Sequence, residues 1–370
     1  MITQVQALRS DLTQTRAVSL ATPALEDGEI LVAIDRFALT ANNVSYALFG
    51  DVIGYWKLFP AVGPWGIVPV WGLADVVASR APEIAVGERL WGFMPMASHL
   101  VMRPAAATER SFTDSAAHRA ELPPVYNTYQ RTRADPPALK GLEDARCLLF
   151  PLFSTSYVLY DYLTDNGFFG AKQVLVGSAS SKTGLGLTNL LSRHGQGRPR
   201  VVGLTSPRNA GFVRTQGSCD EVVTYDAVNA MNPNLPTAFV DMSGDGAVVA
   251  AVHDRLGARL KLSCAVGATH WGADRFRPAH AATPHTFFFA PAQFAKRDAE
   301  WGSGVILRRA QAEAARMSGE LKGALTIRHE RGPQAVRDAW RTLVDNTGAP
   351  DVAVMASLSK DTAERDVQTA

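Results

Sequence analysis

The stretch that decides the fold runs from Gln173 to Leu187 and reads QVLVGSASSKTGLGL. It begins with a short apolar run typical of a buried strand, continues through a turn of small residues, and leads into a helix expected over 183–193. Such a strand–turn–helix segment points backbone N–H groups and the positive end of a helix at one place. That arrangement suits an anion, typically a phosphate.

Three interpretations of this turn stay open as long as the turn is taken alone. Residues 177–183 match the phosphate-binding loop of nucleotide triphosphatases except that Ser181 replaces the second glycine, and Asp241 ends a later apolar run as a magnesium-holding acid would. The dinucleotide-binding turn also fits, with Ser181 and Lys182 at glycine positions and Gly184 as the remaining glycine. The third interpretation is an ordinary turn that binds no ligand.

The next predicted strand, at 200–204, favours a dinucleotide with an additional phosphate. Dinucleotide-binding folds place a selecting residue after their second strand, and an acid there reads the ribose hydroxyls of NAD. Here the strand is followed by TSPRN, which contains Ser206 and Arg208 and no acid. Because a guanidinium binds phosphate oxygens in a forked, charge-assisted way, we expect NADP(H) as the cofactor. The cofactor-binding residues expected from the two turns are Ser180, Ser181, Lys182, Thr183, Gly184, Ser206 and Arg208.

The chain has 370 residues, which is enough for two hydrophobic cores. Short strand-like runs separated by Gly and Pro fill its first third, whereas apolar runs alternate with helical patterns from about residue 150. The second pattern is typical of an α/β fold with a doubly wound parallel sheet covered on both faces. We expect a β-rich domain over 1–150, completed by 292–370, and a nucleotide-binding domain over 151–291. Residues 104–140 are expected to be an irregular connection.

Composition excludes several classes of protein. A formal charge of +2 gives no strong global field, which argues against a dedicated nucleic-acid binder. The three cysteines are far apart, so neither a disulfide framework nor a four-cysteine zinc site is expected. No window approaches the roughly 20 apolar residues of a membrane span, and we therefore expect a cytoplasmic protein that does not bind membranes.

The order of several segments resembles the medium-chain dehydrogenase/reductase superfamily, specifically its zinc-free quinone-oxidoreductase and enoyl-reductase branch. The resemblance covers most of the chain and is closest to a divergent, poorly characterised group. The segments that carry it are GEILV at 28–32, LTANNVSY at 39–46, AVGERLWG at 85–92, TSYVL at 155–159, AFVDMSG at 238–244, CAVG at 264–267 and FFAP at 288–291.

This resemblance implies a GroES-like β-rich substrate domain, a Rossmann-type nucleotide domain and a homodimer. It also implies a reductase that acts on a small-molecule substrate, for which a non-catalytic NADPH-sensing module is the alternative. Four further cofactor contacts follow from it. Thr155 would lie near the nicotinamide and Tyr225 in the region that closes over the adenosine, whereas Gly267 and Phe288 belong to turns beside the cofactor.

No metal site is expected, because residues 38–50 contain neither Cys nor His where the alcohol-dehydrogenase branch binds its catalytic zinc. Without a metal, hydrogen-bond donors must polarise the carbonyl of an enone, quinone or enoyl thioester and stabilise the anion that hydride addition creates. Tyrosine hydroxyls and side-chain amides can do this. We expect Tyr46, Tyr126 and Asn127 in this role, although each residue type also serves in ordinary packing.

Overall fold

The structure is a computed structural model that describes residues 1–266, 283–321 and 323–358. The chain divides into two compact units, one formed by Met1–Leu148 with Leu325–Ala370 and one by Leu149–Ala324. We call them unit 1 and unit 2. Unit 1 is therefore built from both ends of the chain, whereas unit 2 is continuous.

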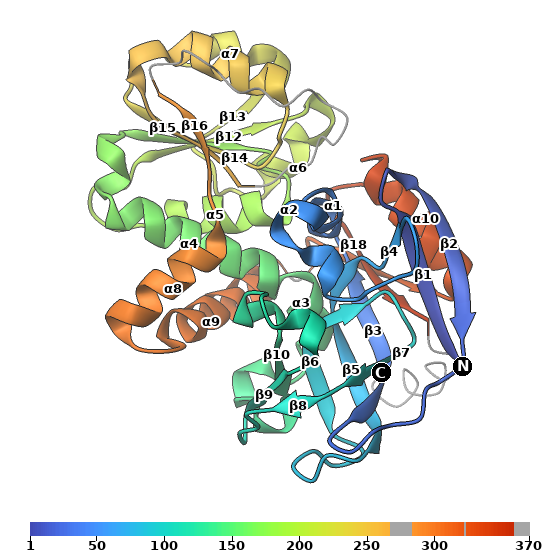
Figure 1. The fold of residues 1–370 in the computed structure, drawn as a ribbon. Helices are drawn as coiled ribbons and strands as arrows, with labels where there is room; N and C mark the ends of the chain where they lie inside the picture. Colours follow the sequence, from blue (N-terminus) through green and yellow to red (C-terminus); the bar gives the residue numbers. More distant parts are fainter. Residues whose placement is uncertain (267–282, 322, 359–370) are drawn as a thin grey trace. The chain divides into compact units, whose positions relative to one another are not determined.

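Unit 2 contains a fully parallel sheet in the order β13-β12-β11-β14-β15-β16 within the described residues (Figure 1). This is the Rossmann order, in which the chain first moves outward from β11 in one direction and then returns to add β14 on the other side. The sequence prediction of a doubly wound parallel sheet is confirmed. The strands are β11 (Gln173–Gly177), β12 (Arg200–Thr205), β13 (Glu221–Thr224), β14 (Thr237–Asp241), β15 (Leu260–Ala265) and β16 (His285–Phe287).

Helices cover both faces of this sheet because successive strand residues point to opposite sides. Val174 and Val176 pack in one core with α4 and α5, whereas Leu175 between them packs in the other core with α7. Figure 1 shows α7 on one face and α4 and α5 on the other. The helices of unit 2 are α4 (Phe150–Asp165), α5 (Lys182–Ser192), α6 (Ala210–Thr215), α7 (Gly246–Leu256), α8 (Ala290–Trp301) and α9 (Val305–Glu320), with 3₁₀ turns at Gly167–Gly170, Pro207–Asn209, Tyr225–Ala230 and Gly257–Arg259.

The boundary between the units differs from the expected return to the first domain at residue 292. Residues 292–324 belong to unit 2 because α8 and α9 pack against each other and against α4. An ionic contact holds this packing together, since the Arg297 guanidinium donates to the Asp161 carboxylate at 2.7 Å and both side chains are nearly buried.

Unit 1 is built mainly from β-strands. Its large sheet has the order β17-β18-β3-β5-β6-β10-β9-β8, with β7 also paired to β3, and a small sheet has the order β2-β1-β4. The described strands are β1 (Ile2–Leu8), β2 (Asp11–Leu20), β3 (Ile30–Leu39), β4 (Trp65–Gly66), β5 (Pro69–Ser79), β6 (Arg89–Pro95), β7 (His99–Met102), β8 (Pro104–Ala105), β9 (Ser111–Asp114), β10 (Thr128–Arg131), β17 (Thr326–Arg331) and β18 (Val352–Ser357).

The helices of unit 1 lie in its connections, and the one between β17 and β18 makes a parallel crossover from the C-terminal part of the chain. They are α1 (Ala41–Leu48), α2 (Gly50–Ile53), α3 (Glu143–Leu148) and α10 (Pro333–Val344), with 3₁₀ turns at Tyr55–Lys57, Ala117–Arg119, Pro124–Tyr126, Thr132–Ala134 and Pro137–Leu139.

The segment 104–140 is not the irregular connection that its composition predicts. It contributes β8, β9 and β10 to the large sheet, and the Arg119 side chain within it is 1% exposed. Arg119 pairs with the buried Asp114 carboxylate at 3.1 Å and donates to the Tyr129 hydroxyl at 2.7 Å. A buried ion pair with added hydrogen bonds thus organises a segment whose charged residues look like those of a surface loop.

Replacing Gly186 by Ala should destabilise the chain, because an added Cβ would lie 2.5 Å from Ser156 Oγ and 2.8 Å from the Phe153 ring where α5 meets α4. We expect a loss of about 1–3 kcal/mol in the free energy of unfolding, measured with urea. Gly211→Ala is the matched control, since its Cβ would meet nothing within 4 Å, and it should be neutral or slightly stabilising. Equal stability of the two variants would contradict this packing.

Candidate functional site

The turn between β11 and α5 is held by hydrogen bonds within the turn and to the neighbouring strand. Ser178 has a φ of 53°, and its carbonyl accepts the Ser181 amide at 2.9 Å. The Ala179 amide donates to Leu204 O on β12 at 3.0 Å. Ser181 is the N-cap of α5, and its hydroxyl accepts the Gly184 amide at 3.1 Å. The serine at a glycine position therefore caps the helix.

Two glycines of this segment are required by close approaches. A Cβ on Gly184 would lie 2.5 Å from Ser178 O, so the first turn of α5 sits directly against the preceding turn. A Cβ on Gly177 would lie 2.5 Å from Asp241 Oδ1, at the point where the chain reverses its direction of sheet building. Ligands of open α/β sheets bind at this switch point, beyond the carboxyl ends of the strands.

Residues after β12 join the same edge of the sheet. The Ser180 hydroxyl accepts a hydrogen bond from Thr205 Oγ1 at 3.2 Å and another from Asn209 Nδ2 at 3.1 Å. The Ser206 hydroxyl is buried and has no hydrogen-bond partner among the described residues. A buried polar group without a partner costs about 1–3 kcal/mol, so a ligand oxygen at Ser206 would remove a penalty. Arg208 is exposed two residues further on.

Tyr225, which follows β13, and Asp241, which ends β14, lie at the same edge of the sheet. The Tyr225 hydroxyl is hydrogen-bonded to the side chain and backbone of Ser178, and burial followed by the nearby Asp241 charge raises its pKa. The Asp241 side chain is fully buried, and it accepts hydrogen bonds from Ser243 N at 2.9 Å, Ser243 Oγ at 2.6 Å and Gly244 N at 3.0 Å. A carboxylate occupied in this way is poorly placed to hold magnesium, which disfavours the nucleotide triphosphatase interpretation.

Helix α4 supports the start of α5 through a residue that the sequence reasoning missed. The single proton of the Ser156 hydroxyl is shared between Leu152 O at 3.0 Å and Thr183 O at 2.8 Å. The neighbouring Thr155 hydroxyl donates to Pro151 O at 3.0 Å within α4. The sequence signal for this contact is the run of small residues at 154–156. Only a short side chain on α4 can bring a hydroxyl to the backbone of the first turn of α5.

The remaining expected cofactor residues lie further along the sheet edge or outside the described part. The Phe288 amide donates to Ala265 O at 2.8 Å after β15, and its ring centroid lies 5.3 Å from that of Tyr162. Gly267 lies outside the described residues. The structure thus brings together the turns after β11, β12, β13 and β14, and Ser178, Thr205 and Asn209 lie at the same edge of the sheet.

In unit 1, three tyrosines form a cluster with Phe93 and Trp71. The Tyr55 and Tyr126 hydroxyls share a hydrogen bond of 2.8 Å, and the Tyr46 ring centroid lies 4.7 Å from that of Tyr55 and 6.3 Å from that of Tyr126. Phe93 stacks on Tyr126 at 5.0 Å. The expected pair Tyr46 and Tyr126 therefore lies in one aromatic cluster, and burial raises the pKa of both hydroxyls.

Tyr46 is arranged as a hydrogen-bond donor. Its oxygen accepts Asn42 Nδ2 at 2.6 Å and Trp71 Nε1 at 3.2 Å. An indole N–H can only donate, and a phenol has two lone pairs and one proton, so these two neighbours occupy its acceptor capacity. The Tyr46 proton has no acceptor among the described residues.

Asn127 is used differently. Its amide nitrogen donates to Asp114 O at 2.6 Å, and its backbone amide donates to Pro124 O at 3.0 Å. These contacts hold the chain that leads from the 3₁₀ turn of Tyr126 into β10. The structure therefore gives Asn127 a part in placing Tyr126.

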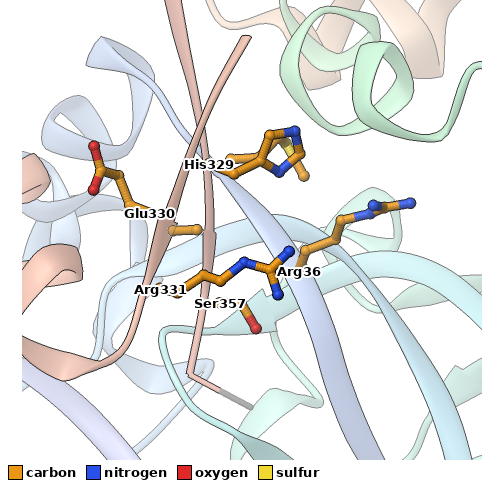
Figure 2. A pocket seen from close by; sticks show the side chains of 7 residues that line it. Arg36, His329, Glu330, Arg331 and Ser357 are labelled. Carbon is orange, nitrogen blue, oxygen red and sulfur yellow. The ribbon is translucent and has the colours of Figure 1, made fainter. Parts of the chain in front are cut away.

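Figure 2 shows a small recess at the carboxyl ends of the parallel strands β17 and β18, where Arg36, His329 and Arg331 lie with Ser357. Two of these side chains lie beside carboxylates, since Arg36 Nη2 lies 2.6 Å from Glu143 Oε2 and His329 Nε2 lies 3.4 Å from Asp144 Oδ2. Burial raises the pKa of Asp144, and Arg36 and His329 oppose that effect. We interpret this cluster as the ionic contact that holds α3 against the large sheet.

No group of three or more His, Cys, Asp or Glu side chains able to hold a metal ion occurs in the part of the chain that the structure describes. Across residues 1–266, 283–321 and 323–358, no helix combines the length and apolar character needed to cross a membrane.

Comparisons with known proteins identify the fold. A model of the family described as "Protein of unknown function (DUF2855)" matches residues 37–349. A search of curated proteins found no match. Among solved structures, CurA from Vibrio vulnificus in complex with NADPH matches with a TM-score of 0.61 and 13% identity, over 97% of this chain and 99% of CurA.

Two further solved structures agree with this result. JamJ enoyl reductase matches with a TM-score of 0.57 and 14% identity over 96% of this chain and 99% of its own. A mycobacterial protein complexed with NADPH matches with a TM-score of 0.56 and 14% identity over 96% of this chain and 100% of its own. At these identities the likeness concerns the fold, and it confirms the predicted medium-chain dehydrogenase/reductase architecture.

The tyrosine cluster should make stability fall at high pH. Burial raises the pKa of Tyr46, Tyr55 and Tyr126 in the folded chain above the ordinary value of about 10, so the unfolded chain loses these protons first. Stability is therefore unaffected by these groups below pH about 10 and declines as pH rises further. Urea midpoints between pH 8 and 11 measure this decline.

The control for this titration is Tyr160, a partly exposed tyrosine of α4 in unit 2. Tyr55→Phe should flatten the decline more than Tyr160→Phe does. Identical slopes for the wild type and both variants would contradict the role of burial in the cluster.

Proposed function

Since the chain belongs to the DUF2855 family and has the fold of medium-chain dehydrogenases and reductases, we propose that it is an NADPH-dependent reductase of activated C=C or C=O bonds. The observation that carries this proposal is the convergence of four turns at the switch point of the parallel sheet, with the buried hydroxyl of Ser206 left without a partner among the described residues.

The residues at this edge fit NADPH. The N-terminus of α5 would bind the pyrophosphate through its first amides, with Thr183 and Lys182 beside it. Ser206 and Arg208 would bind the 2′-phosphate, which would satisfy the Ser206 hydroxyl and pair a guanidinium with a dianion. The matching CurA and mycobacterial structures were obtained with NADPH, which supports the same cofactor here. The remaining proposed contacts are Thr155, Ser180, Ser181, Gly184, Tyr225, Gly267 and Phe288.

NADPH would supply a hydride to the substrate. This chain's own residues would bind the substrate carbonyl and stabilise the negative charge that develops on its oxygen. The Tyr46 hydroxyl is suited to this because both of its acceptor sites are filled, its pKa is raised by burial, and its proton is therefore retained for donation. Tyr126, hydrogen-bonded to Tyr55, would give a second donor from the same cluster, with Asn127 holding it in place.

The proposal has further parts. Unit 1 would be the substrate domain and unit 2 the NADP-binding domain, and the substrate would be a small enone, quinone or enoyl thioester. The reaction would be independent of zinc, and the chain would act as a cytoplasmic homodimer. Incubation of the metal-free protein with NADPH and a panel of such substrates, followed by the loss of nicotinamide absorbance, tests the activity. No oxidation with any member of the panel would overturn it in favour of a non-catalytic NADPH-binding module.

Arg208→Ala should weaken NADPH binding far more than NADH binding. Charge-assisted hydrogen bonds to the 2′-phosphate contribute about 1.5–3 kcal/mol, which corresponds to a rise of roughly 10- to 150-fold in the dissociation constant for NADPH. Calorimetric titration of both cofactors measures the difference. Arg214→Ala, an exposed arginine on the following helix α6, is the matched control and should change neither constant. An equal loss for NADPH and NADH in Arg208→Ala would remove this residue from the phosphate site.

Tyr46→Phe should lower kcat and leave cofactor binding unchanged. Removal of one donor to an oxyanion typically costs roughly 10²- to 10³-fold in kcat, because the contact is strongest in the transition state. Steady-state kinetics with the best substrate of the panel, together with NADPH titration, measures both effects. Tyr160→Phe removes a phenol that is bonded to His194 in unit 2 and should leave kcat unchanged. A Tyr46→Phe enzyme with wild-type kcat would assign the donor role elsewhere.

A further inference from the structure

The β11–α5 turn adopts a backbone conformation that its residue type does not favour. Ser178 has a φ of 53°, in the left-handed region where residues with a Cβ are uncommon and glycine is readily accommodated. The residue is also 6% exposed, so water does not support its polar groups. Something in the structure must therefore hold Ser178 in this conformation.

The conformation of Ser178 determines how α5 begins. Its carbonyl accepts the Ser181 amide at 2.9 Å, and the same oxygen lies where a Cβ on Gly184 would come within 2.5 Å. Ser181 in turn caps α5 by accepting the Gly184 amide at 3.1 Å. A change of φ at Ser178 would move this carbonyl and with it the N-cap, so the placement of the first helical amides depends on one strained residue.

Tyr225 contacts this residue from another strand connection. It follows β13, and its hydroxyl is hydrogen-bonded both to the backbone and to the side chain of Ser178. A rotation about the Ser178 backbone would displace the hydroxyl and the backbone group that are hydrogen-bonded to Tyr225. Both bonds are made to Ser178 in its left-handed conformation.

We propose that Tyr225 is a positioning residue that holds Ser178 in the left-handed conformation and so keeps the amides at the start of α5 ready to bind a phosphate. The hydrogen bonds between Tyr225 and Ser178 stabilise a backbone conformation that glycine would adopt without such support. The phosphate part of the inference rests on the function proposed above, whereas the contact between Tyr225 and Ser178 exists in the protein without a ligand.

A double-mutant cycle separates this role from direct contact with a cofactor. Tyr225→Phe removes the hydroxyl and should raise the NADPH dissociation constant by roughly fivefold, as expected for the loss of one or two hydrogen bonds. Ser178→Gly supplies a residue that adopts positive φ without support. In the Ser178→Gly background, Tyr225→Phe should therefore change the constant by less than about twofold. Tyr160→Phe is the control for loss of a phenol elsewhere in unit 2 and should change nothing in either background.

Amide hydrogen exchange without cofactor gives an independent readout. The Ser181 amide, bonded to Ser178 O, and the Gly184 amide, bonded to Ser181 Oγ, should exchange faster in Tyr225→Phe and return toward the wild-type rate in the double variant. An equal effect of Tyr225→Phe in both backgrounds, or wild-type exchange in Tyr225→Phe, would overturn the positioning role. Absence of NADPH binding to the wild type would instead overturn the proposed function, and the exchange experiment would still decide the role of Tyr225.

Discussion

The start of α5 has to approach the preceding turn so closely that no side chain fits between them, and the organisation of unit 2 depends on this contact. Gly184 lies against the Ser178 carbonyl, and Gly186, two residues further along α5, leaves room for Ser156 of α4. Two short side chains bind the backbone polar groups at this contact, since Ser181 accepts the Gly184 amide and Ser156 donates to Thr183 O. The helix start, its cap and its supporting helix are therefore held together by backbone contacts as much as by apolar packing.

The sequence shows those parts of the fold that depend on local patterns. QVLVG followed by small residues predicts β11 and α5, and the alternating runs after residue 150 predict a parallel sheet, because strand and helix periodicities are read within one segment. The segment 104–140 was misjudged for a physical reason. Its charged residues Asp114 and Arg119 form an ion pair in the interior of unit 1. A prediction from composition places charged residues at the surface, and it therefore missed this buried pair.

The candidate sites were less predictable, because they depend on contacts between distant residues. Tyr55 and Tyr126 are 71 positions apart and meet through the arrangement of unit 1. The left-handed conformation of Ser178 could not be read from the sequence, since serine rarely adopts it and its support comes from Tyr225, which follows a different strand. In contrast, Ser206 and Arg208 could be proposed from the sequence alone, because their position after the second strand is a matter of order along the chain, and their role stays a prediction.

The composition of unit 1 from two separate parts of the chain has a consequence for biosynthesis. Strand β18 pairs with residues 37–39 of β3 and also carries β17, yet it is made after the whole of unit 2. During translation unit 2 is a continuous segment that can fold as soon as it is made. Residues 37–39 of β3 meanwhile lack their partner strand β18. Open strand edges are templates for pairing with other chains, and long-range pairings form slowly. Nascent chains that stop before residue 352 would thus be the species most in need of chaperones.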